Sequence, residues 1–443
     1  MRERPELPPP LPLRARQPGP GGQLLLFAVA LALRVLYAWF ALGPHALPYS
    51  DPAEYDAVAW NLARGLGFSL EAAAGPYPTA MSPPLLPFLV SLLYRVVGHS
   101  YFAAVLFQCV IGALIPVLLA ALGAALFGAA VGRIAGWLSA VHPLLVAMCG
   151  YLLTETLFAA TMLLAIAAVV GWVEAPSRVR ALGAGIALGV ANLARPTILL
   201  LPAALLAWAW VPLRAAVPRG ERARQFALLL SGVALAIGPW TLRNASVFHA
   251  FVPVSSRGGG ALLVGNNDIA WYDPARRGGA ANEIWFRMGE HEFRGLSELE
   301  AQALARSRAL EFVRAHAADF PGVALARLLR FWRLSAEGGG TGTWIHPGSP
   351  LAPLLRRLDP LFLFSAAVFP LAFWGLFASL RGQHPWLQSL GLWVILYFCL
   401  LAVAFFGSLR MRMPVEPLLL LYAAAGIEDV RARARRGRAG GRA

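Results

Sequence analysis

The sequence has few charged residues, no lysine and only three cysteines. Charged residues make up 14% of the 443 positions and hydrophobic residues 58%, whereas a soluble domain is usually about 25% charged. The cysteines, Cys109, Cys149 and Cys399, all lie within apolar stretches and have no metal-ligand spacing. Neither a disulfide framework nor a cysteine metal centre is therefore expected. The shortage of charge also argues against a soluble protein.

All the basic residues are arginine, and the formal net charge is +15. In a soluble protein such a charge would suggest nucleic acid binding. Here many of the arginines lie in short connections between apolar blocks, as the positive-inside rule expects for the cytoplasmic side of a membrane protein. We therefore expect membrane lipids as partners, and no nucleic acid.

The apolar residues occur in long blocks, which is typical of a chain that crosses a bilayer. This pattern predicts an all-α polytopic membrane protein with roughly ten transmembrane helices. The predicted spans are 23–42, 101–126, 131–149, 153–173, 180–194, 197–213, 225–242, 360–380, 387–407 and 414–430.

The arginine-rich connections predict the topology. Residues 1–22 are rich in proline and arginine and should be disordered and cytoplasmic. The basic links near Arg133 and Arg178, the link at 214–224 and the tail 431–443 fall on the same side.

Three polar or short segments then fall outside. They are the first loop, 43–83, a helix at 84–98 that is too short to span and should lie at the interface, and the long segment 243–359. The last should contain helices at 296–316 and 320–335. It separates an N-terminal module, 23–242, from the C-terminal helices, 360–430.

Acidic residues are rare near the predicted membrane. The first outer loop holds Asp51, Glu54 and Asp56, and Asp51 precedes a proline, so we expect a helix to begin there with Asp51 as its N-cap. Glu155 stands alone in GYLLTETLF, at an outer turn between two spans. These acids could be functional, because ionised carboxylates at membrane depth are costly. Helix capping is the simpler alternative for each of them.

Four arginines also fall at the outer edge of the membrane. Each could anchor a helix end at the lipid headgroups. The presence of all four on the outer side contradicts the positive-inside rule. This exception favours a shared anionic ligand such as phosphate. Three scattered histidines show no paired metal-ligand spacing, so a metal site stays undetermined. The arginines are Arg195, Arg243, Arg410 and Arg412, and the histidines are His45, His99 and His142.

These motifs, taken in order, resemble the GT-C superfamily of polyprenyl-phosphate-sugar glycosyltransferases. The nearest branch is glycosyltransferase family thirty-nine, which holds relatives of the protein O-mannosyltransferases and of lipid A aminoarabinose transferase. The matching pieces are SDPAEYDAVAWNLARGLGF, SPPLLPFLVSLLYRVVG, TETLF, LARPT, GPWTLRN, FVPVSSRGGGALLVGNN and RMRMPVEP.

The resemblance implies a GT-C fold and a sugar donor on a polyprenyl phosphate, used on the periplasmic face of a bacterial inner membrane. It implies Asp51 as the general base, with Glu54 and Glu155 as supporting acids. Some relatives carry a basic residue before the Pro-Pro pair of the second motif, where this sequence has Ser82. The outer arginines, Arg195 and those of RMRMPVEP, would then contact the donor phosphate.

Much of the chemistry stays open. The expected reaction is a single displacement with inversion, which needs no covalent intermediate, and a divalent metal could assist it. The sugar could be a hexose or a pentose, and the acceptor a protein, a lipid or a glycan. The alternative is a transporter or flippase of a lipid-linked glycan, although the sequence shows no repeat between its halves.

Overall fold

The computed structural model describes residues 19–43, 48, 50–289, 292–334, 352–382 and 384–440. Within these ranges the chain is helical apart from one two-stranded sheet and the connecting turns, which confirms the prediction of an all-α membrane protein. Most of the expected disordered N-terminus and His45 lie outside these ranges.

The N-terminal group of helices begins at Pro20, three residues before the predicted start. Its members are α1 (Pro20–Tyr37) with the π-helical turn Ala38–Leu42, α4 (Tyr101–Phe127), α5 (Ala129–Ala140), α6 (Pro143–Ala147), α7 (Thr154–Glu174), α8 (Arg178–Ala194), α9 (Leu201–Ala216) and α10 (Arg219–Phe248).

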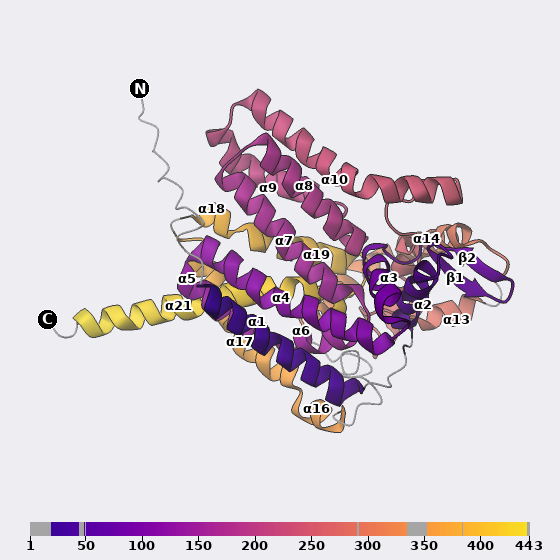
Figure 1. Cartoon of the computed structure of the whole chain (residues 1–443), viewed down its shortest axis with the longest axis horizontal. Helices are drawn as coiled ribbons and strands as arrows, with labels where there is room; N and C mark the ends of the chain where they lie inside the picture. Colours follow the sequence, from indigo (N-terminus) through magenta and orange to yellow (C-terminus); the bar gives the residue numbers. More distant parts are fainter. Residues whose placement is uncertain are drawn as a thin grey trace.

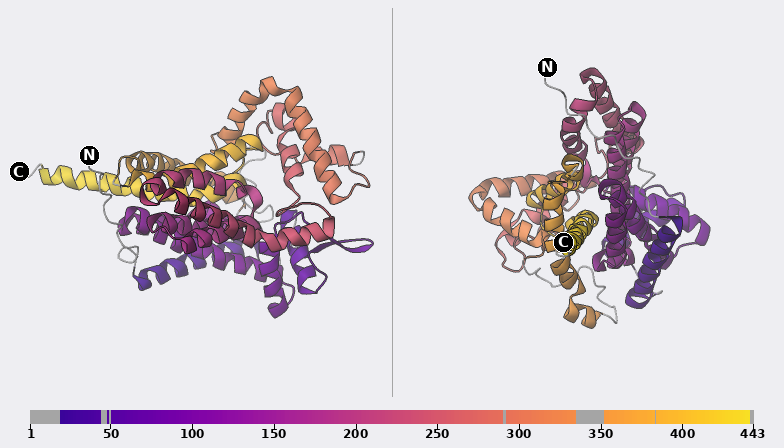
Figure 2. Two further views of the ribbon diagram at one scale, coloured as in Figure 1. Left: turned by 90° about the horizontal axis from the view of Figure 1, so that it is seen from above. Right: turned by 90° about the vertical axis from the view of Figure 1, so that its left-hand side faces the viewer.

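The C-terminal group packs beside it, and Figure 2 shows the two groups as adjacent layers. It consists of α16 (Ala352–Leu358), α17 (Pro360–Ser379), α18 (Pro385–Gln388), α19 (Leu390–Ala404), α20 (Leu409–Arg412) and α21 (Glu416–Gly440). Helix α21 runs on through most of the basic tail and projects from the bundle (Figure 1).

Every predicted span coincides with a helix, although not every helix is long enough to count as a span by itself. Among the described residues, six helices are long and apolar enough to cross a membrane. The number rises to seven if α5 and the following turn 143–150, which meet at 55°, count as one span. Helices α8 and α9 are short, and α21 carries arginines along its second half.

Glycines allow neighbouring helices in the bundle to approach at backbone distance, as is common in membranes. A Cβ on Gly185 of α8 would lie 2.0 Å from the carbonyl oxygen of Leu229 in α10. A Cβ on Gly375 of α17 would lie 1.8 Å from the carbonyl oxygen of Tyr422 in α21. Larger side chains at these two positions would separate the helix pairs.

The elements of the segments expected outside, called here the outer elements, gather at the end of the bundle opposite the projecting end of α21 (Figure 1). The first loop, expected only as a loop with one helix, also forms a hairpin whose register pairs Ser69 with Pro78. The helices expected at 84–98, 296–316 and 320–335 are all present. The elements are α2 (Asp51–Ala63), β1 (Ser69–Ala72), β2 (Gly75–Pro78), α3 (Leu85–Val97), α11 (Gly258–Gly265), α12 (Asp268–Tyr272), α13 (Glu283–Gly289), α14 (Glu298–Ala315) and α15 (Phe320–Phe331).

Two side chains join the outer elements to one another and to the bundle. Glu298, at the start of α14, accepts hydrogen bonds from Thr79 Oγ1 at 2.7 Å and Ser256 Oγ at 2.6 Å, which joins the first loop to the later outer segment. Arg327 of α15 is fully buried and donates to the carbonyl oxygens of Gly265 at 2.6 Å and Ala404 at 3.3 Å. The later outer segment is therefore attached to the first loop through α14 and to α19 through α15.

Candidate functional site

Two cavities meet between the helix groups at the outer end of the bundle. The first, of about 400 Å³, has a mostly apolar lining and is called here the lipid-facing cavity. The second, of about 480 Å³, is lined largely by the outer elements and is called the outer chamber. Among the described charged residues, four line both: Asp51, Arg195, Arg257 and Arg410.

Asp51 stands at the junction of the two cavities, and the prediction that it caps α2 is wrong. It is the first helical residue, the cap position belongs to Ser50, and no side chain caps the helix. Ser50 has a φ of 56°, which is unfavourable for a residue with a side chain and is often seen at functional sites. The Asp51 carboxylate is thereby free to face the arginines.

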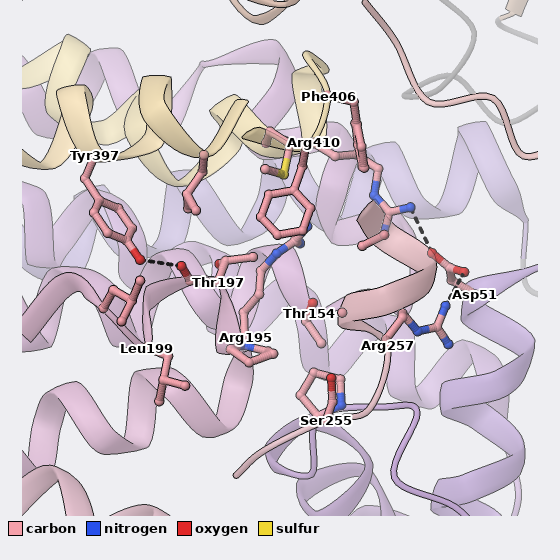
Figure 3. A pocket seen from close by; sticks show the side chains of 18 of the residues that line it. Asp51, Thr154, Arg195, Thr197, Leu199, Ser255, Arg257, Tyr397, Phe406 and Arg410 are labelled. Carbon is pink, nitrogen blue, oxygen red and sulfur yellow. Dashed lines mark hydrogen bonds and ion pairs between the residues drawn. The ribbon is translucent and has the colours of Figure 1, made fainter. Parts of the chain in front are cut away.

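Two arginines reach the Asp51 carboxylate from separate elements (Figure 3). Arg410 Nη1 of α20 lies 2.9 Å from Oδ2, and Arg257 Nη1 lies 3.5 Å from Oδ1. Burial alone would raise the pKa of Asp51, but Arg410 and Arg257 outweigh it and hold that pKa below its ordinary value. Asp51 is therefore an ionised carboxylate when no substrate is bound.

Glu155 holds two of the predicted phosphate-binding arginines together. Its Oε1 accepts from Arg410 Nε at 2.6 Å and pairs with Arg195 Nη1 at 2.8 Å. The Glu155 side chain is fully buried and lines neither cavity. It therefore joins the two arginines from behind the cavity walls.

Glu54 pairs with Arg257 in the way that Glu155 pairs with Arg195 and Arg410. It forms an ion pair with Arg257 Nη2 and accepts a hydrogen bond from Ser82, the residue that stands where some relatives are basic. Like Glu155, Glu54 lines neither cavity. Among the described carboxylates, only Asp51 faces the cavities.

Arg257 is the site residue that sequence reasoning missed. It lies in FVPVSSRGGG, which carries the resemblance, but it is 206 positions away from Asp51. The available signal was a lone arginine directly before a glycine run in an outer segment. The run permits close packing, because a Cβ on Gly259 would lie 1.9 Å from the carbonyl oxygen of Gln302.

Two predicted phosphate ligands do not reach the cavities. Arg243 lies over the first loop and donates to the carbonyl oxygens of Thr79 at 2.8 Å and Phe68 at 2.9 Å. Arg412 is fully buried and pairs with Glu416 at 2.6 Å. The reason for the second case is helical geometry, since residues two apart on a helix point to different sides.

The lipid-facing cavity is apolar along one wall and carries arginines at one end. Its apolar wall comes from the turn before α9 and from α19, and includes Leu199, Leu200 and Leu401. Its polar end holds the shared arginines and Thr154, the first residue of α7 (Figure 3). Helix α3 contributes no described residue to either cavity, whereas Met81 and Pro83, which precede it, line one cavity each.

The charged residues at the junction do not suit a divalent metal. Among the described residues, no three His, Cys, Asp or Glu side chains are grouped so as to hold a metal ion. Asp51, the one described carboxylate that faces the cavities, is already flanked by two guanidinium groups, whose charge opposes a further cation. His142, one of the scattered histidines, lies 3.3 Å from Glu416 in a separate buried cluster.

Comparison with known proteins agrees with this architecture. Residues 81–240 match the family model described as dolichyl-phosphate-mannose-protein mannosyltransferase, a range that includes Ser82, Glu155 and Arg195. The fold matches the oligosaccharyltransferase AglB of Archaeoglobus fulgidus, solved with an inhibitory peptide and a dolichol-phosphate, at 16% identity and a TM-score of 0.58. At this identity the likeness to AglB extends to the fold of the chain.

The coverage of the matching structures limits how far this likeness extends. The match covers 95% of this chain but 51% of the AglB chain, so the chain spans about half the length of that enzyme. A second AglB structure, tethered to an acceptor peptide, matches at 15% identity with a TM-score of 0.58, covering 95% of this chain and 50% of that one. ArnT of Cupriavidus metallidurans, bound to undecaprenyl phosphate, matches at 16% identity over 92% of this chain and 78% of its own, with a TM-score of 0.43. No curated protein sequence matches the chain.

Proposed function

We propose that this chain is a GT-C glycosyltransferase, which transfers a sugar from a polyprenyl-phosphate donor to an acceptor with Asp51 as the general base. The observation that carries the proposal is the position of Asp51, which lines both cavities and lies between Arg257 and Arg410. A base for this reaction must reach the acceptor from one side and the donor from the other.

The donor would occupy the lipid-facing cavity. Its isoprenoid chain would lie against the apolar wall, and its phosphate would lie among Arg195, Arg257 and Arg410. The N-terminus of α7 begins at the same place without a side-chain cap, and its positive dipole end favours an anion. The dolichol-phosphate in the AglB structure, whose fold is similar, is a ligand of this class.

The proposed step is a single displacement with inversion. The acceptor oxygen or nitrogen forms a bond to the anomeric carbon while Asp51 takes its proton. The bond from that carbon to the phosphate oxygen breaks, and polyprenyl phosphate leaves with one additional negative charge. The arginines stabilise this developing charge, so the step needs neither a covalent intermediate nor a metal.

Donor binding would also activate the base. In the absence of substrate, Asp51 is stabilised as a carboxylate by the two guanidinium groups that the donor phosphate would contact. A bound phosphate competes for Arg257 and Arg410, which weakens their hold on Asp51 and makes it a stronger base. The site would then become reactive only when the donor is in place.

The charge of the chain supports an orientation for the site in the membrane. The basic links and the arginine-rich end of α21 lie away from the outer elements (Figure 1). The positive-inside rule then assigns the cavities to the outer face, which we propose is the periplasmic side of a bacterial inner membrane. The transferred group would be a hexose or a pentose.

Substitution of Asp51 tests the proposed function. Asp51→Asn keeps the shape of the side chain but removes the base, so we expect transfer from a polyprenyl-phosphate sugar to fall by about 10²–10⁴. Binding of undecaprenyl phosphate should persist. Asp268→Asn is the matched control, because Asp268 is an exposed outer aspartate that pairs with Arg287 and lines neither cavity. Near-normal turnover in Asp51→Asn would exclude the assignment. Glycan transport without transfer would favour the flippase.

A further inference from the structure

The outer chamber has a strongly basic lining that the donor does not account for. Among the described charged residues on its wall, five are arginine and one is aspartate. Arg195, Arg257 and Arg410 are shared with the lipid-facing cavity, but Arg276 and Arg330 line the outer chamber alone. A second pair of cations beyond the phosphate site would add nothing to the binding of a neutral acceptor.

Arg276 and Arg330 are held on one wall. Arg330 of α15 is buried and donates from Nε to the carbonyl oxygen of Arg277 at 2.6 Å and from Nη2 to that of Ala275 at 2.7 Å. These carbonyls belong to the loop that carries Arg276, so one arginine fixes the loop that presents the other. Arg276 also pairs with Glu283, which does not line the chamber. Guanidinium groups fixed in this way suit the paired oxygens of a carboxylate or phosphate.

The same chamber presents an aromatic ring and amides. Trp285 is half-buried and packs on α11, where a Cβ on Gly260 would come within 2.5 Å of its ring. It also contacts Phe293, with ring centroids 4.8 Å apart. Asn282 and Gln302 line the cavity beside it. A flat apolar ring with a few amide groups is a surface on which a sugar ring can lie and be oriented.

We infer that the outer chamber binds an anionic saccharide as the acceptor, with its carboxylate or phosphate on Arg276 and Arg330. Its nucleophilic hydroxyl would then face Asp51, and its ring would lie against Trp285. This inference rests on the proposed function for the role of Asp51 and adds the class of the acceptor. A peptide acceptor would leave the arginine pair and the aromatic wall without a use.

Binding to the full chain in lipid nanodiscs tests this inference. The probes are trigalacturonic acid, its carboxyl-reduced neutral form, a phosphorylated trimannose with its neutral parent, and a serine-threonine hexapeptide. We expect at least one anionic saccharide to bind about tenfold or more tightly than its neutral counterpart. Arg276→Gln and Arg330→Gln should each abolish that preference. Arg287→Gln is the matched control, since Arg287 is an exposed arginine of α13 outside both cavities, and it should keep the preference.

Several outcomes would overturn the inference. Equal binding of charged and neutral saccharides, a preference that survives both substitutions, or tightest binding of the peptide would each do so. If Arg330→Gln fails to fold, Arg276→Gln still decides, because Arg276 is half-exposed. Undecaprenyl phosphate binding is measured in parallel. Its absence contradicts the proposed function itself, whereas its presence without a preference for anionic saccharides contradicts only the acceptor class.

Discussion

Arg410 and Arg412 are two positions apart and lie in opposite environments. Arg410 lines both cavities and contacts Asp51 and Glu155, with 36% of its side chain exposed. Arg412 has no exposed side-chain surface and is enclosed with Glu416, which also contacts His142. Both arginines have acidic partners, so an ion pair alone does not mark a site. What distinguishes Arg410 is that its guanidinium group can still meet a ligand.

The largest expected effect comes from Arg410. In Arg410→Gln the leaving phosphate loses a cation and Asp51 loses its nearest partner, so kcat/KM should fall by about 10²–10³. We expect kcat to fall and the KM for the donor to rise. The measurement is transfer from a polyprenyl-phosphate sugar per mole of folded protein, because Arg410 also helps to satisfy the buried Glu155.

Arg412→Gln gives the matched comparison. It leaves a buried carboxylate without its guanidinium partner, which should cost about 3–5 kcal/mol of stability. The protein that does fold should retain kcat/KM within about threefold, since Arg412 reaches neither cavity. Thermal unfolding in detergent measures the first quantity. A stable Arg412→Gln protein with lost donor affinity would reverse our assignment of the two arginines.

The contrast between Arg410 and Arg412 shows which features of the site the sequence could predict and which it could not. The apolar blocks predicted the positions of the spans, because the bilayer requires long apolar helices. The rarity of acids drew attention to Asp51 and Glu155, which the fold does bring to one group of arginines. The sequence could not separate Arg410 from Arg412, because the direction of a side chain on a four-residue helix depends on its exact start.

Long-range pairing was a second limit. The contact between Arg257 and Asp51 joins an outer segment to the first loop, and no local pattern encodes it. The hairpin at 69–78 was missed for a different reason. Its strands have four residues each and include two prolines, so they carry almost no alternation.

A smaller effect should appear in the pH dependence. The base must be deprotonated, so activity is lost as the pH falls through the pKa of Asp51. Arg410 and Arg257 lower that pKa in the free protein, which sets the acid limb of kcat/KM below the ordinary pKa of an aspartate. In the donor complex the negative charge of the phosphate offsets the effect of both arginines on the pKa of Asp51. The acid limb of kcat should therefore lie about one pH unit or more above the acid limb of kcat/KM.

Arg257 provides the control for this pH effect. Arg257→Gln should move the acid limb of kcat/KM upward and narrow its separation from the limb of kcat, whereas Arg257→Lys should keep both near their original positions. Coincident limbs in the unsubstituted protein would contradict activation of the base by the donor.

The smallest expected effect is that of metal removal. A chelator such as EDTA should change the rate of transfer by less than about twofold, because arginines occupy the positions around the leaving phosphate where a divalent cation would act. The sharper experiment combines EDTA with Arg410→Gln and then adds Mg²⁺ or Mn²⁺. In the Arg410→Gln protein, Asp51 has one guanidinium group fewer beside it and therefore has room and charge for a cation. Partial rescue of transfer by the metal ion in this variant, and none in the parent protein, would show that Arg410 takes the place of a metal ion. Loss of parent activity in EDTA, restored by a metal ion, would show instead that the arginines are insufficient.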